Sequence, residues 1–289
     1  PRTRPQSIND ISYTAQRKFT VSTDGAGSAT INLTATGETF ANTTDWIFAD
    51  ADGNVSTGLS VSGVGTQAAT ISGGPVSSSN FEIYAYVNKA NATSKVKTLT
   101  ETTVTAAVES DGSGTIFLDL GRADIYDVSR IRQTDSDGAD FTSRFVLDNG
   151  QRDNFYALGK LILRDGYPVP TSNVFARFRY FAHSTSGDFF SVNSYSGQVD
   201  YGDIPAHRLN NGSVVSLADV LDFRSVQDAN GDYVGANARI MELPEPQTSV
   251  TADVIYYLPR TDVLAISETS QLKVYTGKSS FTPITPDVP

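Results

Sequence analysis

The sequence predicts an all-β fold, built from two antiparallel β-sandwich-like domains in tandem. Its 15 Phe and 13 Tyr mostly stand beside β-branched residues, the composition that strands favour. The 23 Gly and 12 Pro are spread along the chain, which is typical of many short strands joined by tight turns. Apolar residues at helical spacing are almost absent, and a hydrophobic fraction of 39% is enough for real cores.

Alternation of apolar and polar residues locates the first strands. In residues 30–35, Ile31, Leu33 and Ala35 fall on one face. In residues 81–87 every second residue is apolar, so the expected inner side chains are Phe81, Ile83, Ala85 and Val87. This period of two is what a half-buried antiparallel strand requires.

A domain boundary is expected near residue 105. Residues 95–107 are Thr-rich without Gly or Pro, which predicts a strand that runs into a linker or the next sheet. Residues 108–114 (VESDGSG) then repeat the pattern of 21–27 (VSTDGAG), and we interpret both as the same kind of hairpin turn. We therefore expect an N-terminal β-sandwich-like module over 1–104 and a β domain with an extended C-terminal tail over 105–289.

Strand patterns continue in the second part. Residues 174–181 (VFARFRYF) carry bulky side chains on both faces, so this strand should be covered on both sides. Residues 249–258 and 264–275 also have β patterns, and Pro residues space out the tail after Phe281.

Composition and charge exclude several functional classes. A net charge of −10 without clusters of Lys and Arg argues against nucleic-acid binding. The absence of cysteine removes disulfides, thiolate metal sites and cysteine nucleophiles, and fits assembly in a reducing cytoplasm. No apolar run approaches the length that spans a bilayer, so we expect no membrane partner. The chain begins with Pro1, so we expect it to be a piece of a longer protein.

Catalytic and metal-binding patterns are weak. The sequence has two histidines, His183 and His207, and no G-x-S-x-G motif, so we expect both to be hydrogen-bonded structural residues. Acidic clusters at 50–54, 135–138 and 228–232 lack the Gly and Glu spacing of an EF-hand loop. We interpret them as hairpin turns, with a calcium site at one such loop as the alternative. We expect no enzymatic activity, no cofactor and no metal.

Five blocks in order are more specific. They are residues 140–156 (DFTSRFVLDNGQRDNFY), 187–195 (GDFFSVNSY), 201–205 (YGDIP), 217–224 (LADVLDFR) and 256–260 (YYLPR). Together they resemble a family of virion structural proteins from contractile-tailed bacteriophages, cyanophages especially, which are associated with the tail fibre or the baseplate. The resemblance covers about 105–275, and Ser225 departs from it where proline is expected.

The residues in these blocks indicate architecture rather than chemistry. Local side-chain bonds are expected in the turn formed by Asp148, Asn149, Gly150, Gln151, Arg152 and Asp153, where Arg152 can bridge Asp148 or Asp153. Asp222 and Arg224 should share one side of an extended segment, with Phe223 on the other. Pro259 and Arg260 would position a connection at a strand end. We expect Asp222, Arg224 and Arg152 to be at least half buried and hydrogen-bonded.

The resemblance implies a non-enzymatic structural role, linking or spacing parts of the tail, baseplate or fibres. Its partners would be other virion tail proteins and copies of itself, with a trimer implied by the family. Two alternatives stay open: a tailspike that binds or degrades a host-surface glycan, and a bacterial surface adhesin module. Residues 98–107, with one charge and no proline, form a poorly protected sheet edge, and the tail 282–289 is too polar to fold alone. Both are expected to lie against neighbouring chains.

Overall fold

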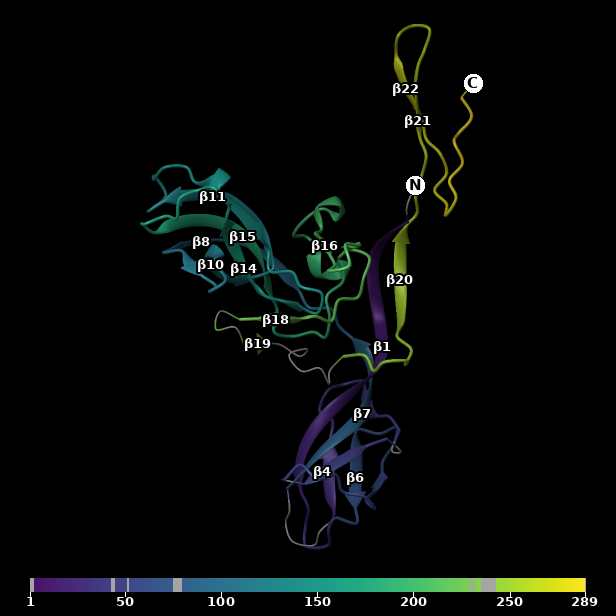
Figure 1. The fold of residues 1–289 in the computed structure, drawn as a ribbon. Helices are drawn as coiled ribbons and strands as arrows, with labels where there is room; N and C mark the ends of the chain where they lie inside the picture. Colours follow the sequence, from purple (N-terminus) through teal and green to yellow (C-terminus); the bar gives the residue numbers. More distant parts are fainter. Residues whose placement is uncertain are drawn as a thin grey trace.

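The computed structural model describes residues 3–42, 45–50, 52–74, 80–228, 230, 232–234 and 243–288. It is an all-β fold, as predicted, in which the described residues form strands and three short 3₁₀ turns. No described segment forms a helix long and apolar enough to cross a membrane. Figure 1 shows one β sandwich at the bottom of the view and a second at the upper left. A long strand pair rises from the lower sandwich to the N-terminus, and the chain extends beyond it towards the C-terminus.

The first sandwich contains the N-terminal strands. These are β1 (Arg4–Ser22), β2 (Ala29–Asn32), β3 (Glu38–Phe40), β4 (Ile47–Asp50), β5 (Ser60–Ser62), β6 (Ala68–Ser72) and β7 (Asn80–Ala92). β7 pairs with β1, β3 and β4 in one sheet, while β2, β6 and β5 form the second. The predicted inner residues of β7 are confirmed, because Phe81, Ile83, Ala85 and Val87 are all 3% exposed or less. They pack against Phe40 and Ile71 in one core.

The second sandwich follows. Its elements are β8 (Lys97–Ala106), β9 (Glu109–Ser110), β10 (Ile116–Ala123), β11 (Ile125–Gln133), η1 (Thr142–Arg144), β12 (Phe145–Asp148), β14 (Leu158–Leu163) and β15 (Val174–His183). The sheets run β11-β15-β8 and β12-β14-β10-β9. Leu118, Leu161 and Phe178 from the two sheets meet in its core. Both faces of β15 are covered along most of its length, which the bulky side chains on its two faces predict.

A loop-rich region closes one end of the second sandwich. Its short elements are β13 (Phe155–Tyr156), η2 (Val192–Tyr195), η3 (Tyr201–Asp203), β16 (Ala206–Arg208), β17 (Val214–Ser216), β18 (Ser225–Gln227) and β19 (Tyr233–Val234). Phe189 and Val192 of this region pack against Ile8 and Ile11 of β1. The two sandwiches are thereby connected through side chains as well as through the chain.

The C-terminal part returns to the N-terminus and then extends away. β20 (Thr251–Tyr257) pairs with the first half of β1, and β21 (Val263–Ile266) forms a hairpin with β22 (Leu272–Tyr275). In Figure 1 this hairpin projects beyond the N-terminus, and the last residues run beside it. We call residues 258–288 the C-terminal arm. Residues 282–288 form no strand.

The predicted division at 104/105 falls inside β8, which pairs with β15 from Lys97 to Ala106. The strand therefore belongs to the second sandwich. Residues 4–12 pair with 251–257, so the first and last segments share a sheet. Whether 1–104 and 105–289 fold separately stays a prediction.

The acidic clusters form turns, as predicted. Asp24 and Asp111 each accept backbone N–H groups two and four residues later, so the two similar segments build the same turn. Asp50, Asp135 and Asp228 also accept backbone N–H groups from residues that follow them. Ala51, Ala229 and Gly231 of these clusters lie outside the described residues.

Candidate functional site: a buried charged network and two surfaces

The predicted turn at 148–153 is built by its own side chains. Asp148 accepts the backbone N–H of Gly150 at 3.0 Å, and its carboxylate receives two hydrogen bonds from Arg152 at 2.9 and 2.7 Å. Asn149 accepts the N–H of Gln151 at 3.1 Å. Gly150 has φ +81, and a Cβ there would lie 2.1 Å from the Ala157 carbonyl oxygen, so the position requires glycine.

Asp222 and Arg224 form a buried pair. The guanidinium donates to both carboxylate oxygens at 2.9 and 2.7 Å, and to the Arg152 carbonyl oxygen at 2.8 Å. Both side chains are buried, whereas Arg152 is more than a third exposed. Phe223 lies on the other side, where its ring packs on Tyr13. The pair thus ties the 217–224 segment to the 148–153 turn.

Three other predicted positions, Pro259, Arg260 and Asp153, lie apart from this pair. Arg260 pairs with Asp262 at 2.9 Å on the exposed arm, and the Pro259 carbonyl oxygen accepts the Ser280 N–H at 3.1 Å. They connect segments within the arm. Asp153 faces the loop region, where its carboxylate meets His207 Nε2 at 3.0 Å.

The centre of the network is an ion pair that sequence reasoning missed. Lys97 Nζ lies 2.6 Å from Asp124 Oδ2, and the two residues are 0% and 1% exposed. The ammonium also donates to the hydroxyls of Tyr156 at 3.2 Å and Tyr195 at 3.0 Å, so each of its three N–H bonds has an acceptor. Tyr156 in turn donates to Asp222, which links the two ion pairs.

Three further groups hold Asp124 in place. His183 Nε2 lies 2.8 Å from Oδ2, and the Gln151 side-chain amide donates to Oδ1 at 2.8 Å. Its backbone carbonyl accepts the Phe181 N–H at 3.1 Å. Asp124 has φ 55, a left-handed conformation uncommon outside glycine, between β10 and β11. His183 stands opposite Lys97 in the β15–β8 pairing, so both strands deliver side chains to the same carboxylate.

Aromatic rings enclose the Lys97 ammonium. Its Nζ lies 4.5–5.6 Å from the ring centroids of four residues, which are Phe190, Tyr156, Tyr195 and Phe181. Ring faces attract a cation, and more strongly where water is excluded. The enclosure therefore strengthens every polar interaction inside it.

Burial and charge shift the titration of these groups. Burial opposes ionisation of Asp124, yet Lys97 and His183 hold the pKa of that carboxyl well below its usual range. Burial alone would lower the pKa of Lys97, but the Asp124 carboxylate raises it. Burial raises the pKa of Tyr195 to about 12, and it lowers the pKa of His183. At neutral pH the pair is charged and His183 is neutral.

The Lys97–Asp124 centre of the network is closed to any large substrate, although Asp222 and Arg224 also line a surface pocket of about 380 Å³. Lys97, Asp124, Tyr156 and Tyr195 are buried, and the guanidinium of Arg224 is satisfied by protein oxygens. Within the described parts of the chain, no group of three or more His, Cys, Asp or Glu could hold a metal ion. The arrangement is suited to locking β8, β15 and the 217–224 loop together.

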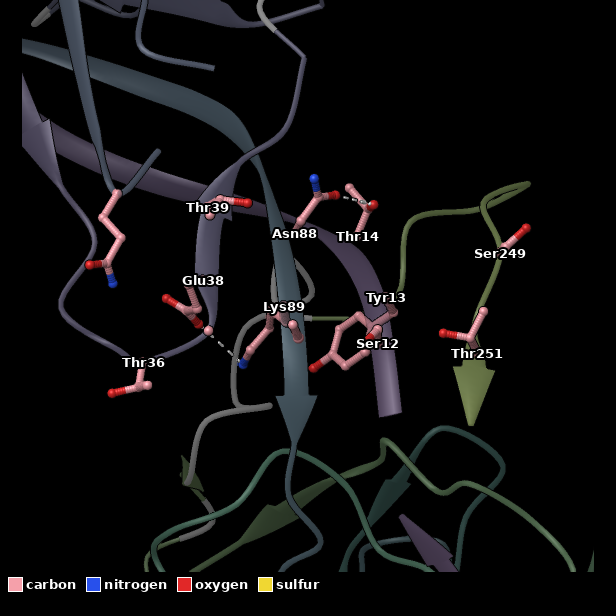
Figure 2. A pocket seen from close by; sticks show the side chains of 13 residues that line it. Ser12, Tyr13, Thr14, Thr36, Glu38, Thr39, Asn88, Lys89, Ser249 and Thr251 are labelled. Atoms are coloured by element: carbon pink, nitrogen blue, oxygen red, sulfur yellow. Dashed lines mark hydrogen bonds and ion pairs between the residues drawn. The ribbon is translucent and has the colours of Figure 1, made fainter. Parts of the chain in front are cut away.

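A surface cleft of about 620 Å³ lies where β1 leaves β7 and meets β20. Seven hydroxyl side chains line it: Ser12, Tyr13, Thr14, Thr36, Thr39, Ser249 and Thr251. Figure 2 shows Ser249 and Thr251 standing across the cleft from Glu38 and Thr39. Glu38, the one carboxylate among the described lining residues, is buried and receives two hydrogen bonds of 2.7 Å from Arg17. The cleft can hydrogen-bond a polar ligand, but it lacks a second acid beside Glu38.

Comparison with protein-family models, curated proteins and solved structures finds no match to this chain. The phage resemblance is therefore carried by the sequence blocks alone. The structure gathers three of these blocks at the network, through the side chains of Gln151, Tyr156, Phe190, Tyr195, Asp222 and Arg224.

Proposed function

We propose that the chain is a non-enzymatic structural component of a phage virion, which assembles with other copies of itself and with other tail proteins. The observation that carries the assembly role is the C-terminal arm, which carries eight exposed large apolar side chains. The closed network supports a rigid structural part rather than an active site. The resemblance of the five sequence blocks supports the place of assembly, in the tail, baseplate or fibre region, after synthesis in the bacterial cytoplasm.

The hairpin of the arm has one aliphatic face. Leu264 stands opposite Val274, and Ile266 stands opposite Leu272. These four side chains are 61–72% exposed, although cross-strand aliphatic pairs normally cover part of a core. A two-stranded hairpin is marginally stable alone in water, so this face needs a cover.

The exposed apolar area is large enough for a stable interface. The arm and the adjoining end of β20 carry eleven large apolar side chains that are 38–82% exposed: Ile255, Tyr256, Tyr257, Leu258, Leu264, Ile266, Leu272, Val274, Phe281, Ile284 and Val288. At such fractions they present on the order of 1,000 Å², and a standard interface needs about 800 Å² from each partner. Scattered exposed apolar residues are ordinary, but a contiguous set marks an interaction surface.

A second copy is the occupant that we propose for this surface. Symmetric association of identical chains is the commonest way to bury such a surface. The resemblance of the sequence blocks implies three copies. The edge strand β8 offers a second contact. It pairs with β15 on one side and lies at the edge of its sheet among the described strands, with Glu101 as its one charge after Lys97.

The virion assignment predicts that the chain is present in purified particles of the phage that encodes it. Mass spectrometry of such particles should detect the protein in stoichiometric amounts. Electron cryo-microscopy should place both sandwiches in the tail, with the arm against a neighbouring subunit. Absence of the chain from washed particles would remove the virion assignment.

Recognition of a host-surface glycan is a second candidate function, which the hydroxyl-lined cleft favours. Neutral trisaccharides such as triacetylchitotriose and mannotriose are the probes, with titration calorimetry as the measurement. Replacing Thr36 and Thr39 by Val should weaken binding about tenfold or more, since each lost hydrogen bond costs about 1 kcal/mol. Thr30→Val with Thr70→Val, on the outer face of the β2–β6 pair, is the matched control. Equal affinities of the two double variants, or no binding by the unaltered chain, would rule out this function.

A further inference from the structure

We propose that Lys97 and Asp124 become joined by an intramolecular amide bond, formed between Nζ and Cγ with the release of one water molecule. This cross-link is independent of the role in a virion. It rests on the contact between a buried amine and a buried carboxyl group, and on the groups that surround both.

The two reacting groups are already in contact. Nζ lies 2.6 Å from Oδ2, inside an enclosure where both side chains are almost fully buried. Two groups held at such a distance react as if each were present at a very high concentration. This proximity takes the place of the chemical activation of the carboxyl group that amide formation needs in solution. The left-handed backbone of Asp124 and its bond to Phe181 fix the direction of the carboxyl group.

The step balances without a co-reactant. The nitrogen attacks Cγ and forms the N–C bond, two of the three Nζ protons move to Oδ2, and the Cγ–Oδ2 bond breaks to release water. Oδ1 gains negative charge during the attack, and the Gln151 amide donates to this oxygen at 2.8 Å. His183 Nε2 contacts the departing oxygen at 2.8 Å.

A route also exists for freeing the amine. The Tyr156 hydroxyl accepts a hydrogen bond from Nζ at 3.2 Å and donates one to Asp222. It can therefore take a proton from Nζ while its own proton moves to Asp222. Both transfers reverse after the amine has attacked. The surrounding rings exclude water. Replacing two buried charges by one neutral amide removes their desolvation cost, and the shortage of water opposes hydrolysis of the product.

The bond would give a covalent cross-link to a chain that has no cysteine and therefore no disulfide. It would tie the start of β8 to the junction of β10 and β11, and it would close the loop between residues 97 and 124. Such a closed loop stabilises a fold by restricting the unfolded chain, as a disulfide does. Unlike a disulfide, an amide persists in a reducing compartment.

Mass spectrometry of the purified full chain tests the proposal. We expect the denatured protein to weigh one water molecule less than its sequence. Trypsin should fail to cut after Lys97, and it should yield peptide 96–122 joined to peptide 123–130. A full sequence mass together with cleavage after Lys97 would overturn the proposal, whatever the behaviour of the variants.

Variants identify the bonded residues. Lys97→Met and Asp124→Ala should each restore the full mass expected for their sequences. Lys95→Met is the matched control, because Lys95 is buried two residues earlier and its Nζ faces the ring of Phe190 at 5.3 Å. This control should keep the loss of one water. If Lys95→Met has its full sequence mass and Lys97→Met keeps the loss of one water, the link is formed by Lys95 and the proposal is wrong.

Discussion

Replacing Lys97 by Met is expected to lower the free energy of unfolding by about 3–5 kcal/mol, because Asp124 would be left buried without its cation. Met fits the aromatic enclosure in length, so the loss would come from the link and not from a cavity. The result is the same in direction whether the two side chains form an ion pair or an amide. For a fold of this size each kcal/mol shifts the melting temperature by about 2–4 °C, so a fall of about 10 °C or more is expected.

A control and a rescue make this result specific. Lys18→Met removes a surface pair with Glu82, and such pairs contribute about 1 kcal/mol or less. Adding Asp124→Asn to Lys97→Met removes the unpaired charge, keeps an acceptor for Gln151, and suits the left-handed backbone. The double variant should recover part of the lost stability in urea titrations. Equal melting temperatures for Lys97→Met and Lys18→Met would show that the buried pair contributes nothing.

Periodicity identified the strands because it reports local burial. The inner face of β7 could be predicted because four apolar residues alternate with polar ones. The turns at Asp24 and Asp111 could be predicted because they depend on residues adjacent in the sequence. The position of the boundary between the two parts of the chain was harder to predict from the sequence. It depends on which strand β8 pairs with, and its partner residues in β15 lie between 68 (Ala106 to Val174) and 86 (Lys97 to His183) residues further along the chain.

Only those ion pairs of the charged network whose partners are close in sequence could be predicted. Arg152 with Asp148 and Arg224 with Asp222 are four and two residues apart, so proximity in sequence suggested them. Lys97 begins β8 and Asp124 lies in the junction between β10 and β11, so they are distant in sequence. Lysine is also so rarely buried that a strand position gives no warning. One signal was present: Lys97 has the same strand phase as Leu99, which packs against Phe181 and Tyr195. This is the face of β8 opposite to the one that Val104 and Ala106 turn to the sandwich core.

Polar substitution of the arm is expected to convert the assembled protein into a monomer. The variant replaces Leu264, Ile266, Leu272 and Val274 by Thr, which keeps a strand-forming residue at each position while removing the aliphatic face. Light scattering should report an oligomer for the unaltered chain and a mass near 31.0 kDa for the variant. The melting transition of the sandwiches should remain, because these four side chains contact neither core.

The matched control places the same change on isolated apolar residues. Val55, Val64, Val169 and Val214 are also more than half exposed but lie far apart in the sequence and outside the arm, so their replacement by Thr should leave the oligomer intact. Loss of assembly in both variants would show that general surface polarity matters and not the arm. A monomeric unaltered chain at micromolar concentration would contradict self-association. The aliphatic face would then belong to an interface with a different protein, because its four side chains lie on one side of the hairpin and are 61–72% exposed.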